Sequence, residues 1–125
     1  MKRAWLILFC SSLRLTAAGA IPDSAAVRAI LGEGANQTYQ AMLGIACAIR
    51  NRGSLQGVYG ADNPAARRAP ARVAARALRA WTASAGHDIT GGCHYFGSPQ
   101  DAAYFHHRLH YRAVLKIGDI TFYKP

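Results

Sequence analysis

Glu33 is the single glutamate in a chain of 125 residues, and it stands between two glycines, Gly32 and Gly34. One apolar segment ends before it and another begins soon after, so its carboxyl group is offered an environment poor in water. Burial disfavours the ionised form and keeps a carboxylic acid protonated to higher pH, as general acid catalysis requires. A surface or helix-capping carboxylate is the alternative interpretation of a lone acidic residue near a helix end.

A second stretch with groups suited to ligand binding is Gly-His-Asp-Ile-Thr-Gly-Gly-Cys-His-Tyr-Phe, residues 86–96. Its glycines let the backbone approach a ligand closely. Thr90 and the amides after it can hydrogen-bond the hydroxyl groups of a ligand. Alternation beyond Gly92 would point Cys93 and Tyr95 to one face and their neighbours to the other, so that one face enters the core while the other lines a cleft.

Histidines invite a metal hypothesis, since His94 is followed by His106, His107 and His110. Two of these are adjacent in sequence, and the chain contains no His-Glu-x-x-His helix of the zinc-protease kind. We therefore expect no metal and no other cofactor.

The elements that must position Glu33 are predicted to be helices. Residues 25–31 have the apolar spacing of a helix with one buried face, and Asp23 or Ser24 can cap this helix. The glycines at 32 and 34 end it and place Glu33 in or just after the last turn. The helix dipole disfavours a carboxylate there, which raises its pKa.

A second helix is predicted from Thr38, as its N-cap, to residue 52, with Gly53 at the left-handed position after its end. Its apolar stripe is interpreted as core. Residues 54–69 are expected to be loop-like, and a third helix runs from Pro70 to about residue 84. Arginines surround this third helix and are interpreted as a solvated basic face. The end of the chain reads as two short strands around Gly118-Asp119.

Three stretches, in this order, resemble the cell-wall hydrolases of the spore-cortex-lytic type. Residues 32–52 have an acidic residue among small residues, a short turn, and a helix ending in Asn51-Arg52. Residues 88–96 are similar to the family's Asp-x-Thr-x-Gly-Ala segment and aromatic pair, with Gly-Cys replacing the commoner Gly-Ala. Residues 117–123 resemble its closing Ile-Gly-x-x-x-Phe-Tyr motif. In family order, the three stretches are spread over nearly the whole length of the chain after residue 25.

The resemblance implies an α+β fold, a mostly helical lysozyme-like single domain with a small β-hairpin lining the cleft. It also implies cleavage of the peptidoglycan glycan strand between N-acetylmuramic acid and N-acetylglucosamine, without a metal. Glu33 falls on the family's catalytic glutamate, and Asn51 and Arg52 are expected to support the site. Substrate contacts are expected from Thr90, Gly91, His94, Tyr95 and Tyr123.

Glycosidases ordinarily use two carboxylates, yet this chain has one glutamate and five aspartates. That scarcity favours a lytic transglycosylase, in which the sugar's own 6-hydroxyl attacks and Glu33 serves as acid and then as base. Asp62 or Asp88 as a base for water would instead give a hydrolytic muramidase, which stays open as the alternative.

Residues 1–20 have a basic start, an apolar run and a small-residue end at Ala18-Gly19-Ala20, as a secretory signal peptide does. We expect its removal to leave a catalytic domain of residues 21–125, exported to the periplasm or cell wall, monomeric and without a membrane span. Cys47 and Cys93 would remain, either as a disulfide or as buried free thiols.

The formal net charge of +9 predicts an anionic partner. Peptidoglycan and its associated polymers fit this description, and so do nucleic acids. A non-catalytic basic protein that binds the cell wall or nucleic acid is therefore the rival class. The export segment and the lack of a recognised binding signature argue against a specific nucleic-acid partner.

Overall fold

The computed structural model describes residues 20–125, apart from the side chains at positions 59 and 61. The predicted signal segment lies outside the described residues except for its last position. The helices are α2 (Asp23–Gly34), α3 (Tyr39–Arg52), α4 (Pro64–Arg68) and α5 (Ala71–Ser84). The strands are β1 (Tyr95–Gly97), β2 (Arg112–Ile117) and β3 (Ile120–Lys124). Short helical segments are η1 (Tyr59–Asp62), η2 (Pro99–Asp101) and η3 (Tyr104–Arg108).

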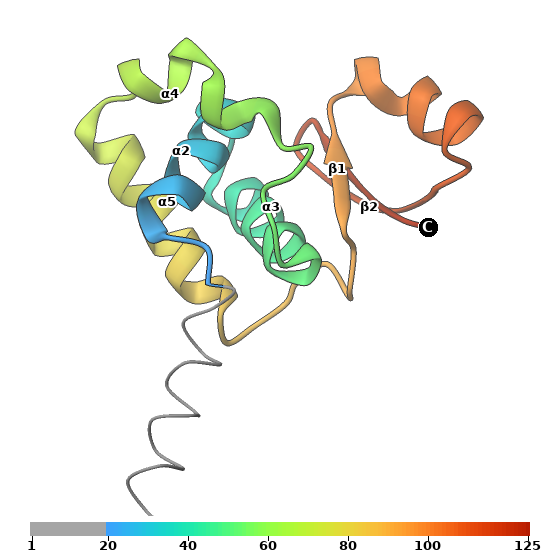
Figure 1. Ribbon diagram of the computed structural model, residues 1–125, viewed down its shortest axis with the longest axis horizontal. Coiled ribbons are helices and arrows are strands. Elements are labelled where there is room, and N and C mark those ends of the chain that lie inside the picture. Colours follow the sequence, from blue (N-terminus) through green and yellow to red (C-terminus); the bar gives the residue numbers. More distant parts are fainter. Residues whose placement is uncertain (1–19) are drawn as a thin grey trace, which may run out of the picture.

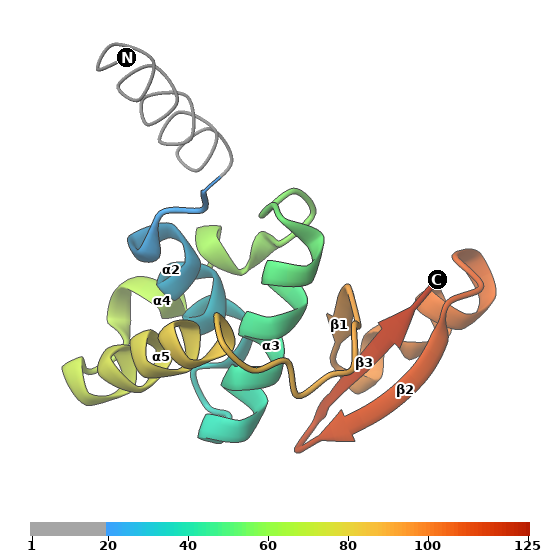
Figure 2. The same cartoon turned by 90° about the horizontal axis from the view of Figure 1, so that it is seen from below.

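Helix α3 lies at the centre of the molecule, with α2, α4 and α5 on one side and the sheet on the other (Figures 1 and 2). Residues 41–49 of α3 are all buried, so the helix is enclosed on every face rather than along the single predicted stripe. Small residues make this possible: a Cβ at Gly44 would overlap the ring of Phe122 from β3. A helix that is apolar all round belongs in the core.

Polar contacts of Trp81 join three helices beside this core. Its indole Nε1 donates a 2.8 Å hydrogen bond to Asp23 of α2. The Arg50 guanidinium of α3 lies 3.7 Å from the centre of the Trp81 ring and donates to the Trp81 carbonyl oxygen at 2.7 Å and to Ser84 Oγ at 2.6 Å. The ends of α2, α3 and α5 are thereby held together.

The predicted ends of α3 are confirmed. Thr38 is the N-cap and its hydroxyl accepts a 3.2 Å hydrogen bond from the Ala41 amide, while Gly53 ends the helix with φ at 75°. The predicted cap of α2 was wrong, because Pro22 occupies that position and the Asp23 side chain is committed to Trp81.

The expectation of a continuous loop over residues 54–69 was also wrong. This region contains η1 and α4, and the side chain of Asn63 joins them. Asn63 Oδ1 accepts from the Ala65 amide at 3.0 Å and so caps α4, which has Pro64 in its first turn. Asn63 Nδ2 donates to the Gly32 carbonyl oxygen at 3.1 Å, which ties the region to the end of α2.

The predicted hairpin at the end of the chain is confirmed, and β1 adds a third strand to it. The sheet is antiparallel in the order β1-β3-β2, with Tyr95 opposite Tyr123 and Phe96 opposite Phe122. The turn between β2 and β3 contains Gly118 at φ 59°. The buried face of β3 rests on α3 through Phe122, which fixes the sheet against the helical part.

Cys47 and Cys93 are both buried and free. Among the helices of residues 20–125, none combines the length and the apolar character that crossing a bilayer demands.

Candidate active site

Glu33 opens into a cavity of about 440 Å³ between the helical part and the sheet. The cavity walls come from the end of α2, the end of α3 with the loop after it, β1, and the segment that follows β1. The lining residues are Glu33, Arg52, Gly57, Val58, Tyr95, Phe96, Asp101, Tyr104, Phe105 and Leu109. Of the residues selected from the sequence, this cavity brings together Glu33, Arg52 and Tyr95.

Glu33 lies in the last turn of α2, as predicted, and is half-buried. The backbone of this turn packs directly against the backbone of η1. The two are so close that a Cβ on Gly32 would overlap the carbonyl oxygen of Gly60. The Gly60 amide donates a 2.9 Å hydrogen bond to Glu33 Oε1. The carboxyl group is thus fixed on one oxygen by the neighbouring backbone.

Burial is the main reason that the pKa of Glu33 is raised above its ordinary value. The hydrogen bond from Gly60 opposes the rise, and the negative charge of Asp101 adds to it. The sequence predicted this direction from two causes, burial and the helix dipole, and burial is the one that dominates in the structure. A carboxyl group in this environment holds its proton further toward neutral pH and can donate it to a bound molecule.

Asp101 is a second carboxylate in the cavity that the sequence reasoning missed. Its Oδ2 accepts two hydrogen bonds from Ser98, one from the amide and one from the hydroxyl, both at 2.9 Å. The signal for it was present as Ser98-Pro99-Gln100-Asp101, a capping-box pattern with proline in the first turn. Asp62 and Asp88, the aspartates first considered as second carboxylates, are not among the lining residues.

Aromatic rings form the wall of the cavity on the side of the sheet. Phe105 stacks on Tyr123 with ring centres 4.3 Å apart, and Tyr95 lies 4.5 Å from Tyr111. Tyr123 is itself buried, so it supports this wall from behind. Tyr104 is 55% exposed at the cavity and meets Phe105 edge to face at 5.9 Å. Sugar rings pack well against exposed aromatic faces of this kind, which combine an apolar face with a polar tip.

Arg52 connects three walls of the cavity. Its guanidinium lies 5.1 Å from the centre of the Tyr95 ring and donates to the Gln56 carbonyl oxygen. Arg50, two residues earlier, faces the opposite side of α3 and packs on Trp81. Of the two arginines, only Arg52 lines the cavity.

Asn51 lies beside the cavity and holds the glycine-rich loop. Its side-chain Nδ2 donates to Asp88 Oδ2 at 3.0 Å, to the Cys93 carbonyl oxygen at 2.9 Å and to Thr90 Oγ1 at 3.4 Å. Asp88 also accepts from the amides of Thr90 and Gly92, each at 2.8 Å. Burial acts to raise the pKa of Asp88, but these hydrogen bonds outweigh it and lower the pKa to about 2.

The residues of this loop that were predicted to contact sugar are not among those that line the cavity. Thr90 is 1% exposed and its hydroxyl donates to Asp88 Oδ1 at 2.7 Å, which favours a role in holding the loop over the sugar contact expected from the sequence. Gly91 is exposed at φ 65° and stabilises the turn geometry. His94 pairs with β3 through a 3.3 Å backbone hydrogen bond to Tyr123. None of the three is among the cavity-lining residues.

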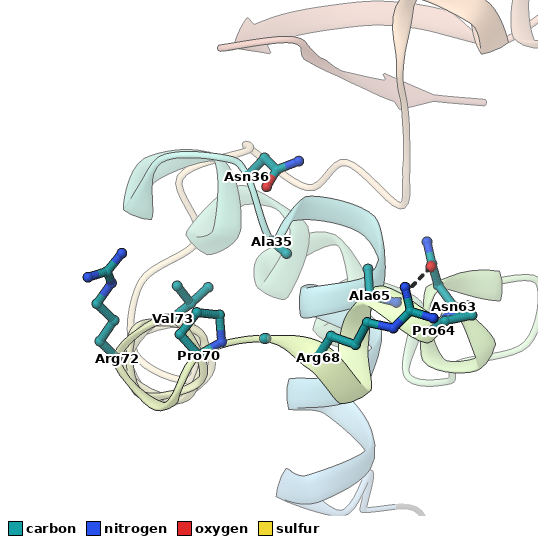
Figure 3. A pocket seen from close by; sticks show the side chains of 10 residues that line it. Ala35, Asn36, Asn63, Pro64, Ala65, Arg68, Pro70, Arg72 and Val73 are labelled. Carbon is teal, nitrogen blue, oxygen red and sulfur yellow. Dashed lines mark hydrogen bonds between the residues drawn. The ribbon is translucent and has the colours of Figure 1, made fainter.

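A larger cavity, of about 610 Å³, lies beyond the end of α2, between the α2–α3 turn and the connection of α4 to α5 (Figure 3). Its floor is made of small and apolar side chains, and its charged lining residues are Arg68 and Arg72. It has no carboxyl group to act as an acid. The smaller cavity at Glu33 is therefore the candidate active site. Within residues 20–125, no three His, Cys, Asp or Glu side chains gather in a group suited to a metal ion.

The architecture is that of the lysozyme-like α+β class, as the sequence predicted. No protein-family profile and no curated protein matches the chain. Two solved structures do. The catalytic domain of the Bacillus cereus SleB protein is 24% identical, with a TM-score of 0.57 over 82% of this chain and 88% of that one.

The catalytic domain of the germination-specific lytic transglycosylase SleB from Bacillus anthracis is 22% identical, with a TM-score of 0.63 over 85% of this chain and 98% of that one. These likenesses show that the chain has the fold of that catalytic domain over most of its length. The family resemblance drawn from three short motifs is thereby confirmed at the level of the fold.

Proposed function

We propose that this protein cleaves the glycan strands of peptidoglycan between N-acetylmuramic acid and N-acetylglucosamine, with Glu33 as the catalytic acid and base. The observation that carries the proposal is the half-buried Glu33, with its raised pKa, in a cavity walled by aromatic rings. Support comes from the fold, which is shared with the catalytic domain of a protein described as a lytic transglycosylase.

The proposed reaction is transglycosylation. Glu33 donates its proton to the oxygen that leaves the anomeric carbon of N-acetylmuramic acid, and the glycosidic C–O bond breaks. The 6-hydroxyl oxygen of the same sugar then bonds to that carbon, and its proton passes to the Glu33 carboxylate. The acid is restored, no water is consumed, and the product carries a 1,6-anhydro ring.

The environment of Asp88 argues against hydrolysis with this residue as the base for water, and so supports transglycosylation. Its carboxylate is engaged by Asn51, Thr90 and Gly92, and its pKa of about 2 makes it a poor base. Hydrolysis stays as a second candidate for one specific reason: Asp101 lines the same cavity as Glu33. A muramidase would use Asp101, rather than Asp62 or Asp88, as the base for water.

The deciding experiment digests purified peptidoglycan with the mature protein and identifies the products by mass spectrometry. Anhydromuropeptides would support transglycosylation, and reducing-end muropeptides would support hydrolysis. Glu33→Gln should abolish turnover while the protein stays folded. Asp119→Asn, at the exposed hairpin turn, is the matched control because it removes one negative charge away from the cavity and should leave turnover unchanged.

Export to the periplasm or cell wall is part of the same proposal, since the substrate lies outside the cytoplasm. Binding of peptidoglycan without cleavage is the outcome that contradicts the proposed activity. If a folded wild-type protein adheres to peptidoglycan and releases no products, the function is that of a basic envelope-binding protein, and the acid role of Glu33 is rejected.

A further inference from the structure

We propose that Asp101 is the second carboxylate of the active site and that it stabilises the positive charge that develops on the sugar ring as the glycosidic bond breaks. The inference rests on the proposed function and adds a residue that neither the sequence motifs nor the fold comparison assigns. Asp101 forms no covalent bond in this role, so the balance of the reaction is unchanged.

The two carboxyl groups come from distant parts of the chain to one cavity. Glu33 lies in the last turn of α2, Asp101 is the last residue of η2, and both line the same cavity of about 440 Å³. The other charged side chain of the lining is Arg52, which is directed to the Tyr95 ring and the Gln56 carbonyl oxygen. Tyr95 and Tyr104 are the remaining ionisable groups of the lining. Among the described lining residues, Glu33 and Asp101 are therefore the two carboxyl groups that a bound sugar would meet.

The backbone around Asp101 holds its carboxylate in a fixed position. Ser98 donates both its amide and its hydroxyl to Oδ2. With the side chains at positions 59 and 61 left aside, no group within residues 20–125 donates a hydrogen bond to Oδ1, so this oxygen can interact with a ligand. A charge held by the scaffold before substrate arrives needs no reorganisation during the reaction, which is the condition under which electrostatic stabilisation is largest.

Gly97 brings this carboxylate close to the end of β1. A Cβ at Gly97 would lie 2.8 Å from the Phe105 ring and 2.9 Å from Asp101 Cβ. The Asp101 side chain and the end of β1 are therefore packed without a gap. The arrangement places the carboxylate directly beside the aromatic wall against which a sugar would lie.

The electrical effect of Asp101 already reaches Glu33, because its negative charge contributes to the raised pKa of that acid. The same field favours a cation formed in the cavity. A carboxylate at this place would thus act twice, by keeping the acid protonated and by lowering the energy of the oxocarbenium-like transition state. A purely structural aspartate that only caps η2 would do neither.

The test compares Asp101→Asn with two matched variants on soluble glycan chains. Asn keeps the shape and an oxygen that can accept from Ser98, but removes the charge. Asp119→Asn removes an equal charge away from the cavity. Ser98→Ala keeps the charge of Asp101 and removes one of its two fixed hydrogen bonds. We expect D101N to lower kcat by roughly 10²-fold with little change in KM, and D119N to keep the wild-type kcat. Ser98→Ala should lower kcat by less than D101N does, because it loosens the carboxylate but keeps its charge.

A second readout separates charge from structure. In D101N the alkaline limb of the pH–rate profile should move to lower pH, and the Glu33 carboxyl resonance should titrate at lower pH in NMR. If D101N fails to fold, Asp101→Ser keeps a capping group without the charge and takes its place. An active wild type with D101N equal to D119N in kcat and in Glu33 titration would overturn the inference. A wild type without activity would overturn the proposed function instead.

Discussion

Gly32 and Gly60 lie against each other with no room for a side chain on either. A Cβ at Gly32 would overlap the Gly60 carbonyl oxygen, and a Cβ at Gly60 would lie 2.6 Å from the Ala29 carbonyl oxygen and 2.6 Å from Glu33 Cγ. This contact brings the amide of Gly60 within hydrogen-bond distance of the Glu33 carboxyl group. The position of the candidate acid therefore depends on the close approach of two backbone segments.

Gly60→Ala is expected to separate η1 from α2 and to remove the hydrogen bond to Glu33. Overpacking of this kind typically costs about 1–3 kcal/mol, so the free energy of unfolding should fall by that amount and activity should fall with it. Chemical denaturation measures the first effect and product release the second. Gly86→Ala is the control, because a Cβ there would meet nothing within 4 Å. Equal stability of the two variants would show that the glycine contact does not position the acid.

The sequence predicted the features that depend on neighbouring residues. Thr38 and Gly53 mark the ends of α3 because caps are local, and the glycines around position 33 mark the end of α2 for the same reason. The two strands around Gly118 likewise follow from a local turn. Features that depend on distant contacts were missed.

Asp101 is one such feature, since only the return of the chain after β1 brings it to Glu33. Thr90 was assigned to a ligand because the sequence could not reveal that Asp88 and Asn51 engage its hydroxyl. In each case the missing information was the partner of the side chain.

The pH dependence of activity should report the raised pKa of Glu33. An acid catalyst works while protonated, so kcat/KM should fall as pH rises through the pKa of Glu33 in the folded protein. Because burial raises that pKa, the fall should come at higher pH than for an exposed glutamate. Rate measurements between about pH 3 and about pH 9 test this, because that range begins below the ordinary pKa of a glutamate and ends above neutrality. If kcat/KM instead falls at the ordinary pKa of an exposed glutamate, the buried environment assigned to Glu33 is contradicted.

Glu33 should also affect stability with the opposite trend from a salt-bridged carboxylate. Its raised pKa means that ionisation is disfavoured in the folded state. The folded protein should therefore lose stability as pH rises from the ordinary pKa of a glutamate through the raised pKa of Glu33. Glu33→Gln removes the ionisation. The variant should therefore be more stable than wild type at neutral pH and nearly equal at low pH. Thermal unfolding at both pH values measures the difference, and a variant less stable at neutral pH would contradict the prediction.

Asp88→Asn should weaken the glycine-rich loop. Asp88 has a pKa lowered from 3.8 to about 2, so its stabilising contribution is full above about pH 4 and is lost as pH falls through about 2. The variant should lose about 1 kcal/mol at pH 7, a value reduced because the carboxylate is exposed. The difference from wild type should shrink toward pH 2. Thermal unfolding by circular dichroism across this range tests it, with Asp119→Asn as the control of equal charge.

Tyr104 should contribute to substrate binding rather than to chemistry. Its ring is 55% exposed, lines the cavity beside Phe105, and carries no hydrogen bond that fixes it among the described residues. Contacts of one aromatic ring are typically worth about 0.5–1.5 kcal/mol, so Tyr104→Ala should raise KM about 2- to 12-fold with kcat nearly unchanged. Tyr104→Phe keeps the ring and should stay close to wild type.

Leu78→Ala is the matched control for that experiment, because Leu78 is a similarly exposed apolar side chain on α5, outside the Glu33 cavity. It removes apolar surface without touching the proposed binding wall, so its KM should equal that of wild type. A common rise in KM for Leu78→Ala and Tyr104→Ala would indicate a general loss of surface affinity. A fall in kcat confined to Tyr104→Ala would instead place this ring at the reacting atoms, because an interaction made only in the transition state lowers kcat and kcat/KM together.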